Sequence, residues 1–93
     1  MMVLEEQDQA ERQRAEQFIA ETPRINGVDS VRVELGEDST GHPAMWLVFH
    51  LERNLNVDYD WARRFNEYAA VIQTKILHND PKRFPYTRLE HAA

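Results

Sequence analysis

The sequence predicts a single α+β domain over residues 1–93, in which two helices cover one face of a three-stranded sheet. Ninety-three residues is the length of one domain. Apolar residues recur every three or four positions through residues 58–78, the pattern of an amphipathic helix. In two earlier segments, residues 28–35 and 44–52, they recur at every second position, as they do in strands. With one helix before these segments and one strand after them, the order is α-β-β-α-β, a ferredoxin-like arrangement.

The first predicted element is a helix over residues 3–21. Its weak apolar stripe consists of Leu4, Ala15, Phe18 and Ile19. Because the first half of this helix is almost wholly polar, we expect only its last two turns to pack on a core, and residues 1–10 to fray or to lie against a partner. Thr22 and Pro23 end the helix, since the residue before a proline avoids helical geometry.

Two strands follow a turn at Asn26 and Gly27. The strand over residues 28–35 has its apolar side chains on one face: Val31, Val33 and Leu35. The strand over residues 44–52 is apolar on both faces, with Met45, Leu47, Phe49 and Leu51 on one and Trp46 and Val48 on the other. A strand of that kind is usually covered on both sides. The polar loop over residues 36–43 joins the two strands into an antiparallel hairpin.

The second helix and the last strand complete the fold. Asp58 is the expected N-cap, and the helix is expected to stop near residues 78–81. Its apolar stripe comprises Trp61, Phe65, Tyr68, Ala69, Ile72 and Ile76. The strand over residues 85–90 begins with Pro85, which has no N–H to donate to a ladder, so we expect this strand at a sheet edge.

The face of the sheet turned away from the helices is the expected interaction surface. A right-handed crossover places both helices on one face, so the face that carries Trp46 and Val48 stays open. Because an exposed apolar sheet face is most often a protein interface, we expect a homodimer or a protein partner to be bound there, through Trp46 and Val48.

Composition narrows the classes of function. The net charge is −5, from 16 acidic and 11 basic residues, which disfavours nucleic acid as a partner because phosphate contacts need clustered Lys and Arg. Cysteine is absent, so disulfides, thiolate metal sites and thiol nucleophiles are excluded. No leader and no long apolar run are seen, so we expect a cytoplasmic protein without a membrane span. Residues 1–22 are acidic and residues 82–93 basic, and two ends of opposite sign can meet within one molecule or between two.

Catalytic motifs are missing from the sequence. There is no GxSxG, no P-loop and no paired-carboxylate motif, so we expect no enzyme and no catalytic residues. The string from Asp38 to Gly41, Asp-Ser-Thr-Gly, resembles the Asp-Thr-Gly of aspartic proteases, but two residues rather than one separate Asp38 from Gly41. A hairpin loop made of turn-forming residues is the better interpretation.

One histidine is a candidate metal ligand. His50 falls on the same strand face as Trp46 and Val48, and Glu52 follows two residues later, so an imidazole and a carboxylate are expected to project from that face together. The alternative is a hydrogen-bonded structural histidine at the end of a buried strand.

The chain resembles a family of metal-linked domains. Residues 23–33, PRINGVDSVRV, are similar to the start of the cytoplasmic C-terminal, metallochaperone-like domain of cation diffusion facilitator transporters. The His50-Leu51-Glu52 run resembles the His-Ile-Glu of that family. Residues 54–57 resemble its Leu-Ser-Val helix entry, and Phe84-Pro85 resembles the Phe-Pro before its last strand, which ends in a histidine, here nearest to His91. The hairpin loop also looks like one in small stand-alone bacterial proteins of unassigned role.

The resemblance implies a dimeric domain that binds a divalent metal such as zinc, with His50, Glu52 and His91 as the candidate ligands. The family's histidine early in the second helix falls near Trp61 or Ala62 here, so that ligand is missing. The sequence thus predicts a non-enzymatic regulatory module that self-associates through its open sheet face and is modulated by metal. An accessory or antitoxin-like subunit that binds only protein is the alternative.

Overall fold

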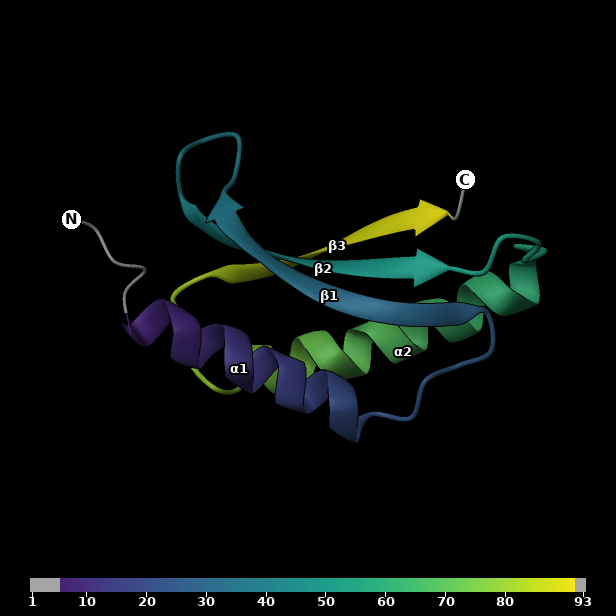
Figure 1. The fold of residues 1–93 in the computed structure, drawn as a ribbon, viewed down its shortest axis with the longest axis horizontal. Coiled ribbons are helices and arrows are strands. Elements are labelled where there is room, and N and C mark those ends of the chain that lie inside the picture. Colours follow the sequence, from purple (N-terminus) through teal and green to yellow (C-terminus); the bar gives the residue numbers. More distant parts are fainter. Residues whose placement is uncertain (1–5, 92–93) are drawn as a thin grey trace.

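The computed structural model describes residues 6–91, which form two helices and three strands (Figure 1). The elements are α1 (Glu6–Glu21), β1 (Val28–Glu37), β2 (Pro43–Leu51), α2 (Tyr59–Leu77) and β3 (Phe84–His91). The predicted α+β class and the α-β-β-α-β order are confirmed. β1 continues to Glu37 and β2 begins at Pro43, because Gly36 pairs with Ala44 and Glu37 with Pro43, and the hairpin loop is therefore shorter than predicted. β2 ends at Leu51, one residue before its predicted end.

The sheet is mixed, with the order β1-β2-β3. β1 pairs with β2 antiparallel, as predicted for the hairpin, and β3 pairs with β2 in parallel after the crossover through α2. β3, which carries Pro85, therefore lies at an edge of the sheet, as expected.

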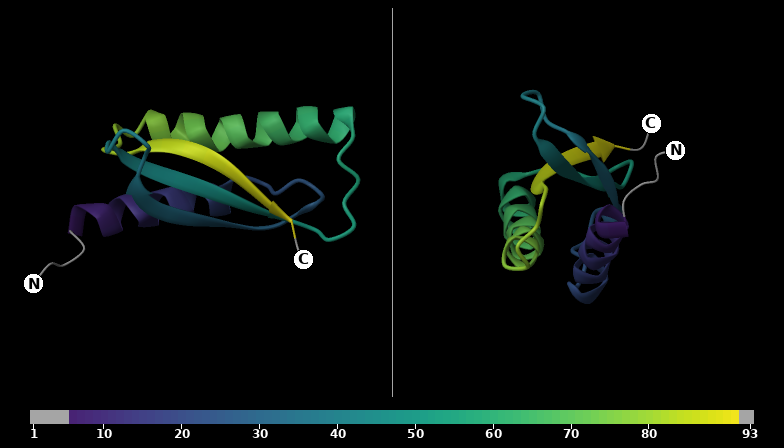
Figure 2. Two further views of the ribbon diagram at one scale, coloured as in Figure 1. Left: turned by 90° about the horizontal axis from the view of Figure 1, so that it is seen from above. Right: turned by 90° about the vertical axis from the view of Figure 1, so that its left-hand side faces the viewer.

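Both helices lie on one side of the sheet, and the hairpin loop rises on the other side (Figures 1 and 2). The core lies between these layers. It is formed by alternate residues of β2 together with the apolar stripe of α2, and Phe65 and Ile72 are buried in it as predicted. The Phe49 ring packs edge-on against two aromatic rings of α2, with centroids 4.9 Å from Phe65 and 5.8 Å from Tyr68.

The start of α2 is fixed by two contacts that its sequence explains. The Asp58 carboxylate accepts a 2.8 Å hydrogen bond from the Trp61 backbone N–H, which confirms the predicted N-cap. The Trp61 indole N–H donates to the Asn26 carbonyl at 2.7 Å, tying α2 to the turn before β1. In that turn Gly27 has φ +99°, and a Cβ there would lie 2.7 Å from Leu55, so glycine is required.

The first half of α1 is anchored by charge, although its polar sequence had predicted that it would not pack. Residues 1–5 lie outside the described residues, and the helix is formed from Glu6 onwards. Asp8 and Glu11 are 5% and 7% exposed, so the expectation that only the last two turns pack is wrong. Asp8 lies 3.5 Å from the Arg83 guanidinium and 3.9 Å from the Lys82 ammonium. The acidic and basic ends of the chain thus meet within one molecule.

Candidate binding face

The surface that carries most of the predicted site residues is the sheet face opposite the helices, called here the open face. Because side chains alternate along a strand, the register assigns its members. Its larger side chains are those of Arg32 and Glu34 of β1, Trp46, Val48 and His50 of β2, and Phe84, Tyr86, Arg88 and Glu90 of β3.

The centre of the open face is covered by two ion pairs that cross β2. Arg32 of β1 reaches Glu90 of β3 at 3.2 Å, and Arg88 of β3 reaches Glu34 of β1 at 3.4 Å. Both arginines are register partners of Val48, so their aliphatic stems pass beside it. Val48 is accordingly 0% exposed in the single chain. The face is open, as expected, but its centre is charged rather than an exposed apolar surface.

This network favours the charged forms of Arg32 and Glu90. Hydrogen bonds from Arg32 lower the pKa of Glu90, with smaller contributions from the charges of Arg32, His50 and Arg88. Hydrogen bonds to Glu90 and then to Glu34 raise the pKa of Arg32. All four side chains are 38–52% exposed, so solvent screens the pairs, and their main role is to hold both arginines across the face.

Three aromatic rings lie beside the charged centre. The Phe84 and Tyr86 centroids are 4.9 Å apart, and Tyr86 stacks on Trp46 at 6.0 Å. Phe84 is 49% exposed, and Trp46 and Tyr86 are partly buried. The Arg88 guanidinium lies 5.6 Å from the Trp46 ring centroid, a cation–π distance.

The hairpin loop is built around one carboxylate. Asp38 Oδ1 accepts hydrogen bonds from the Thr40 N–H (2.9 Å), the Thr40 hydroxyl (2.7 Å) and the His42 N–H (3.0 Å). The Tyr86 hydroxyl donates to Asp38 Oδ2 at 3.2 Å. The bonds from Thr40, followed by those from His42 and Tyr86, lower the pKa of Asp38 to about 2. The string at residues 38–41 is thus a self-capped turn, which agrees with the turn interpretation.

A groove of about 410 Å³ lies between this loop and the aromatic rings. Its lining residues are Asp38, Ser39, Thr40, Trp46 and Tyr86. Gly36 permits this arrangement, because a Cβ there would lie 3.1 Å from the Trp46 indole. No feature of the sequence had marked the groove, since it joins the loop to residues from two strands.

The three predicted metal ligands do not converge. His50 lies on the open face, with Nδ1 4.0 Å from the Glu90 carboxylate, its register partner. His91 pairs with Leu51, one position further along, and so points to the opposite face. Glu52 follows the end of β2 and is exposed. Within residues 6–91 no group of three or more metal-ligating side chains is found.

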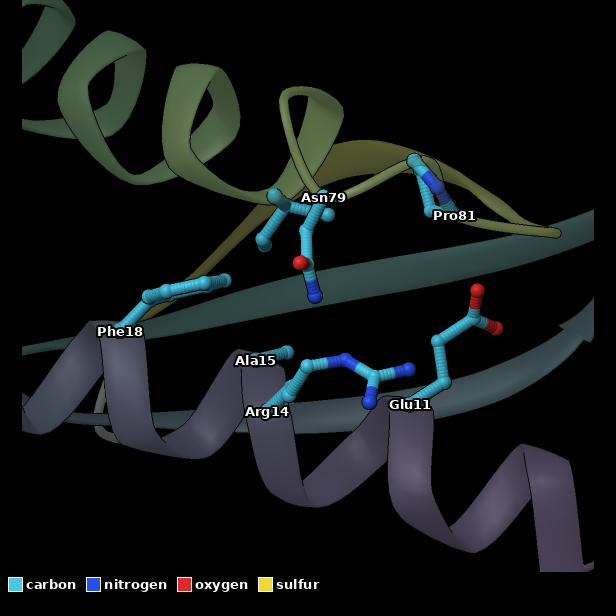
Figure 3. A pocket seen from close by; sticks show the side chains of 7 residues that line it. Glu11, Arg14, Ala15, Phe18, Asn79 and Pro81 are labelled. Carbon is cyan, nitrogen blue, oxygen red and sulfur yellow. The ribbon is translucent and has the colours of Figure 1, made fainter.

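A second polar cluster lies on the helical side of the molecule. Glu11 of α1 accepts a hydrogen bond from the backbone N–H of Lys82, and Arg83 donates to the carbonyls of Gly36 and Ala44. Beside Glu11, a cavity of about 10 Å³ separates α1 from the end of α2, where Asn79 points toward α1 (Figure 3). That volume holds about one water molecule, so the cavity is a packing feature rather than a ligand site.

Comparisons with known proteins identify no relative of this chain. The chain matches no protein-family model, no curated protein and no solved structure. The resemblance to the transporter domain therefore stays a prediction. Across residues 6–91, no helix has the length and apolar character that crossing a membrane requires.

Proposed function

We propose that this protein is a non-enzymatic binding module, cytoplasmic and ferredoxin-like in fold, whose open face self-associates with a second copy of the chain. The observation that carries the proposal is the aromatic row of Phe84, Tyr86 and Trp46 on a face that no described element covers. Partly exposed aromatic side chains are the residues most enriched at the centres of protein interfaces.

The charges of the open face favour a second copy over another occupant. Two arginines and two glutamates alternate across the face, so it has both signs in equal number. In a two-fold dimer each patch meets itself, and a face with balanced charges can exchange its ion pairs between copies. A strongly acidic or strongly basic partner would not meet an electrostatic potential of opposite sign on this face.

The first test places a charge in the aromatic row. Trp46→Glu is expected to shift the protein from dimer to monomer, because it removes the central ring of the aromatic row and places a second carboxylate beside Glu34 at the interface, where it must lose its hydration. The oligomeric state is measured by light scattering across a series of protein concentrations, up to the high micromolar range. Phe84→Glu, at the exposed end of the row, should act in the same direction.

Tyr59→Glu is the matched control. Tyr59 is 82% exposed at the start of α2, so the same kind of substitution there should leave the association unchanged. A wild-type protein that stays monomeric at the highest concentration, or a Tyr59 variant that dissociates as readily as the Trp46 variant, contradicts the proposal.

We further propose that a divalent metal such as zinc modulates this contact through His50. Among residues 6–91, the open face brings together His50 and Glu90, and Glu90 is already held by Arg32, so these residues do not form a complete zinc site. The remaining ligands would have to come from the second copy.

Zinc is therefore expected to strengthen self-association and to raise the melting temperature of the wild-type protein. His50→Ala should abolish both effects while leaving the fold intact, because, among residues 6–91, it removes the only imidazole nitrogen on the open face that could coordinate zinc. His78→Ala is the control, since His78 caps α2 and lies outside the open face. Calorimetry that detects no zinc binding, or binding that survives His50→Ala, removes the metal and leaves the accessory, protein-binding role as the alternative.

A further inference from the structure

The groove at the hairpin end of the open face has a composition suited to one class of ligand. Its lining combines two aromatic rings, Trp46 and Tyr86, with the Asp38 carboxylate and the Thr40 segment, and the Tyr86 hydroxyl donates to that carboxylate at 3.2 Å. Aromatic faces and a carboxylate are the groups with which proteins bind ammonium and guanidinium cations. Its volume of about 410 Å³ falls in the range of small-molecule sites.

The Asp38 carboxylate at this groove is held in place by hydrogen bonds that do not neutralise its charge. Asp38 accepts its hydrogen bonds from backbone N–H groups and hydroxyls, which are uncharged donors. These bonds hold the carboxylate in place and keep it ionised, with a pKa of about 2. The basic group at 4.0 Å is His42, which is charged only when protonated. A full negative charge therefore remains available to a ligand.

The indole already binds a cation within the chain. The Arg88 guanidinium lies over Trp46, at 5.6 Å from the ring centroid, and is anchored on its other side by Glu34. The ring is thus placed as a cation–π acceptor, and its Tyr86 neighbour extends the aromatic wall toward Asp38.

We propose that this groove binds a small organic cation, a quaternary ammonium or an alkylated guanidinium, in contact with the Trp46 and Tyr86 rings and close to the Asp38 carboxylate. The groove is lined by neither Val48 nor the charged side chains over it, although Arg88 of that network contacts Trp46. Binding of a small cation in the groove does not require self-association. Binding of the cation is therefore measured at protein concentrations at which light scattering finds the chain monomeric.

Choline and its uncharged isostere, 3,3-dimethylbutan-1-ol, are the probes, with total chloride held constant. The readout is the pair of indole N–H signals in a nitrogen-15 NMR spectrum of the full chain. The Trp46 signal is expected to move saturably with choline, with a dissociation constant on the order of 1 mM. The Trp61 signal should not move, because that indole is buried and bonded to Asn26. The isostere should bind about tenfold more weakly, since it lacks the charge that faces the carboxylate.

Asp38→Asn tests the carboxylate and Glu37→Gln is its control. Asparagine keeps an oxygen acceptor for the Thr40 and His42 bonds but removes the charge, so choline binding should weaken about tenfold. Glu37 is the adjacent exposed acid and does not line the groove, so its variant should stay within about twofold of the wild type.

Three outcomes overturn the proposal. Equal binding of choline and its isostere would make the groove a merely apolar surface, and this comparison needs no variant. Unchanged binding in Asp38→Asn would exclude the carboxylate. Absence of a saturable Trp46 shift would exclude the small cation altogether; if Asp38→Asn then weakened self-association, the groove would instead accept a basic side chain of the second copy.

Discussion

Replacing Phe65 by alanine is expected to lower the free energy of unfolding by about 3–5 kcal/mol, the cost of removing a buried phenylalanine and leaving a cavity. Phe65 is 7% exposed and lies at the centre of an aromatic cluster. Its ring stacks on Trp61 with centroids 5.3 Å apart and packs edge-on against Phe49 at 4.9 Å. Since a domain of this size has a total stability of only about 5–15 kcal/mol, the variant should be unfolded in a large part of the accessible temperature range.

The measurement is chemical denaturation followed by circular dichroism, with Val71→Ala as the control. Val71 lies on the same helix but is 45% exposed, so its truncation should change stability by less than about 0.5 kcal/mol. An unchanged denaturation midpoint for Phe65→Ala would mean that α2 presents a different face to the sheet.

The sequence predicted the fold well because each element has a strong local signal. The stripe of α2 has an N-cap at Asp58, and the alternation in β1 and β2 is bounded by a glycine-containing turn. These signals act over a few residues, so no tertiary information is needed to interpret them. α1 was misjudged because its first half is anchored by charges, and a polar helical segment gives no local sign of its partner.

The candidate site was only partly predictable, because it depends on register. Arg32 and Glu34 in β1 repeat the Arg-x-Glu pattern of Arg88 and Glu90 in β3, and this repeat is visible in the sequence. Its meaning appears only when β1 and β3 are placed on either side of β2 in opposite directions, so that each arginine reaches the glutamate of the other strand. The expectation that Val48 is an exposed apolar residue failed for the same reason.

Register also separates the predicted ligands. His50 and His91 looked equivalent as strand-end histidines, but a parallel alignment of β2 with β3 pairs His50 with Glu90 and leaves His91 on the other face. A shift of one residue in that alignment would have brought the two histidines together. Sequence spacing determines which face a residue occupies on its own strand, and not which residue lies beside it on the next.

The second large effect is expected at Arg83, which joins three parts of the chain. Its guanidinium lies 3.5 Å from Asp8 on α1 and donates to the carbonyls of Gly36 and Ala44 at the end of the hairpin. The Arg83 and Asp8 side chains are only 13% and 7% exposed. Arg83→Met retains most of the apolar stem but leaves a buried carboxylate without its guanidinium, which should cost about 3–5 kcal/mol.

The origin of that cost can be isolated by a double-mutant cycle. Asp8→Leu in the Arg83→Met background removes the buried carboxylate, which without Arg83 has, within residues 6–91, only the Lys82 ammonium at 3.9 Å, so we expect it to recover a large part of the lost stability. Arg63→Met is the matched control, because Arg63 is 52% exposed and its pairs with Asp60 and Glu67 lie in solvent, where they contribute about 0–1 kcal/mol. If Arg83→Met and Arg63→Met shift the denaturation midpoint equally, or if Asp8→Leu adds its own loss instead of offsetting the first, then the buried pair does not anchor α1. In that case the apolar contacts of Ala15, Phe18 and Ile19 are what hold α1 on the sheet, as the polarity of its first half had suggested.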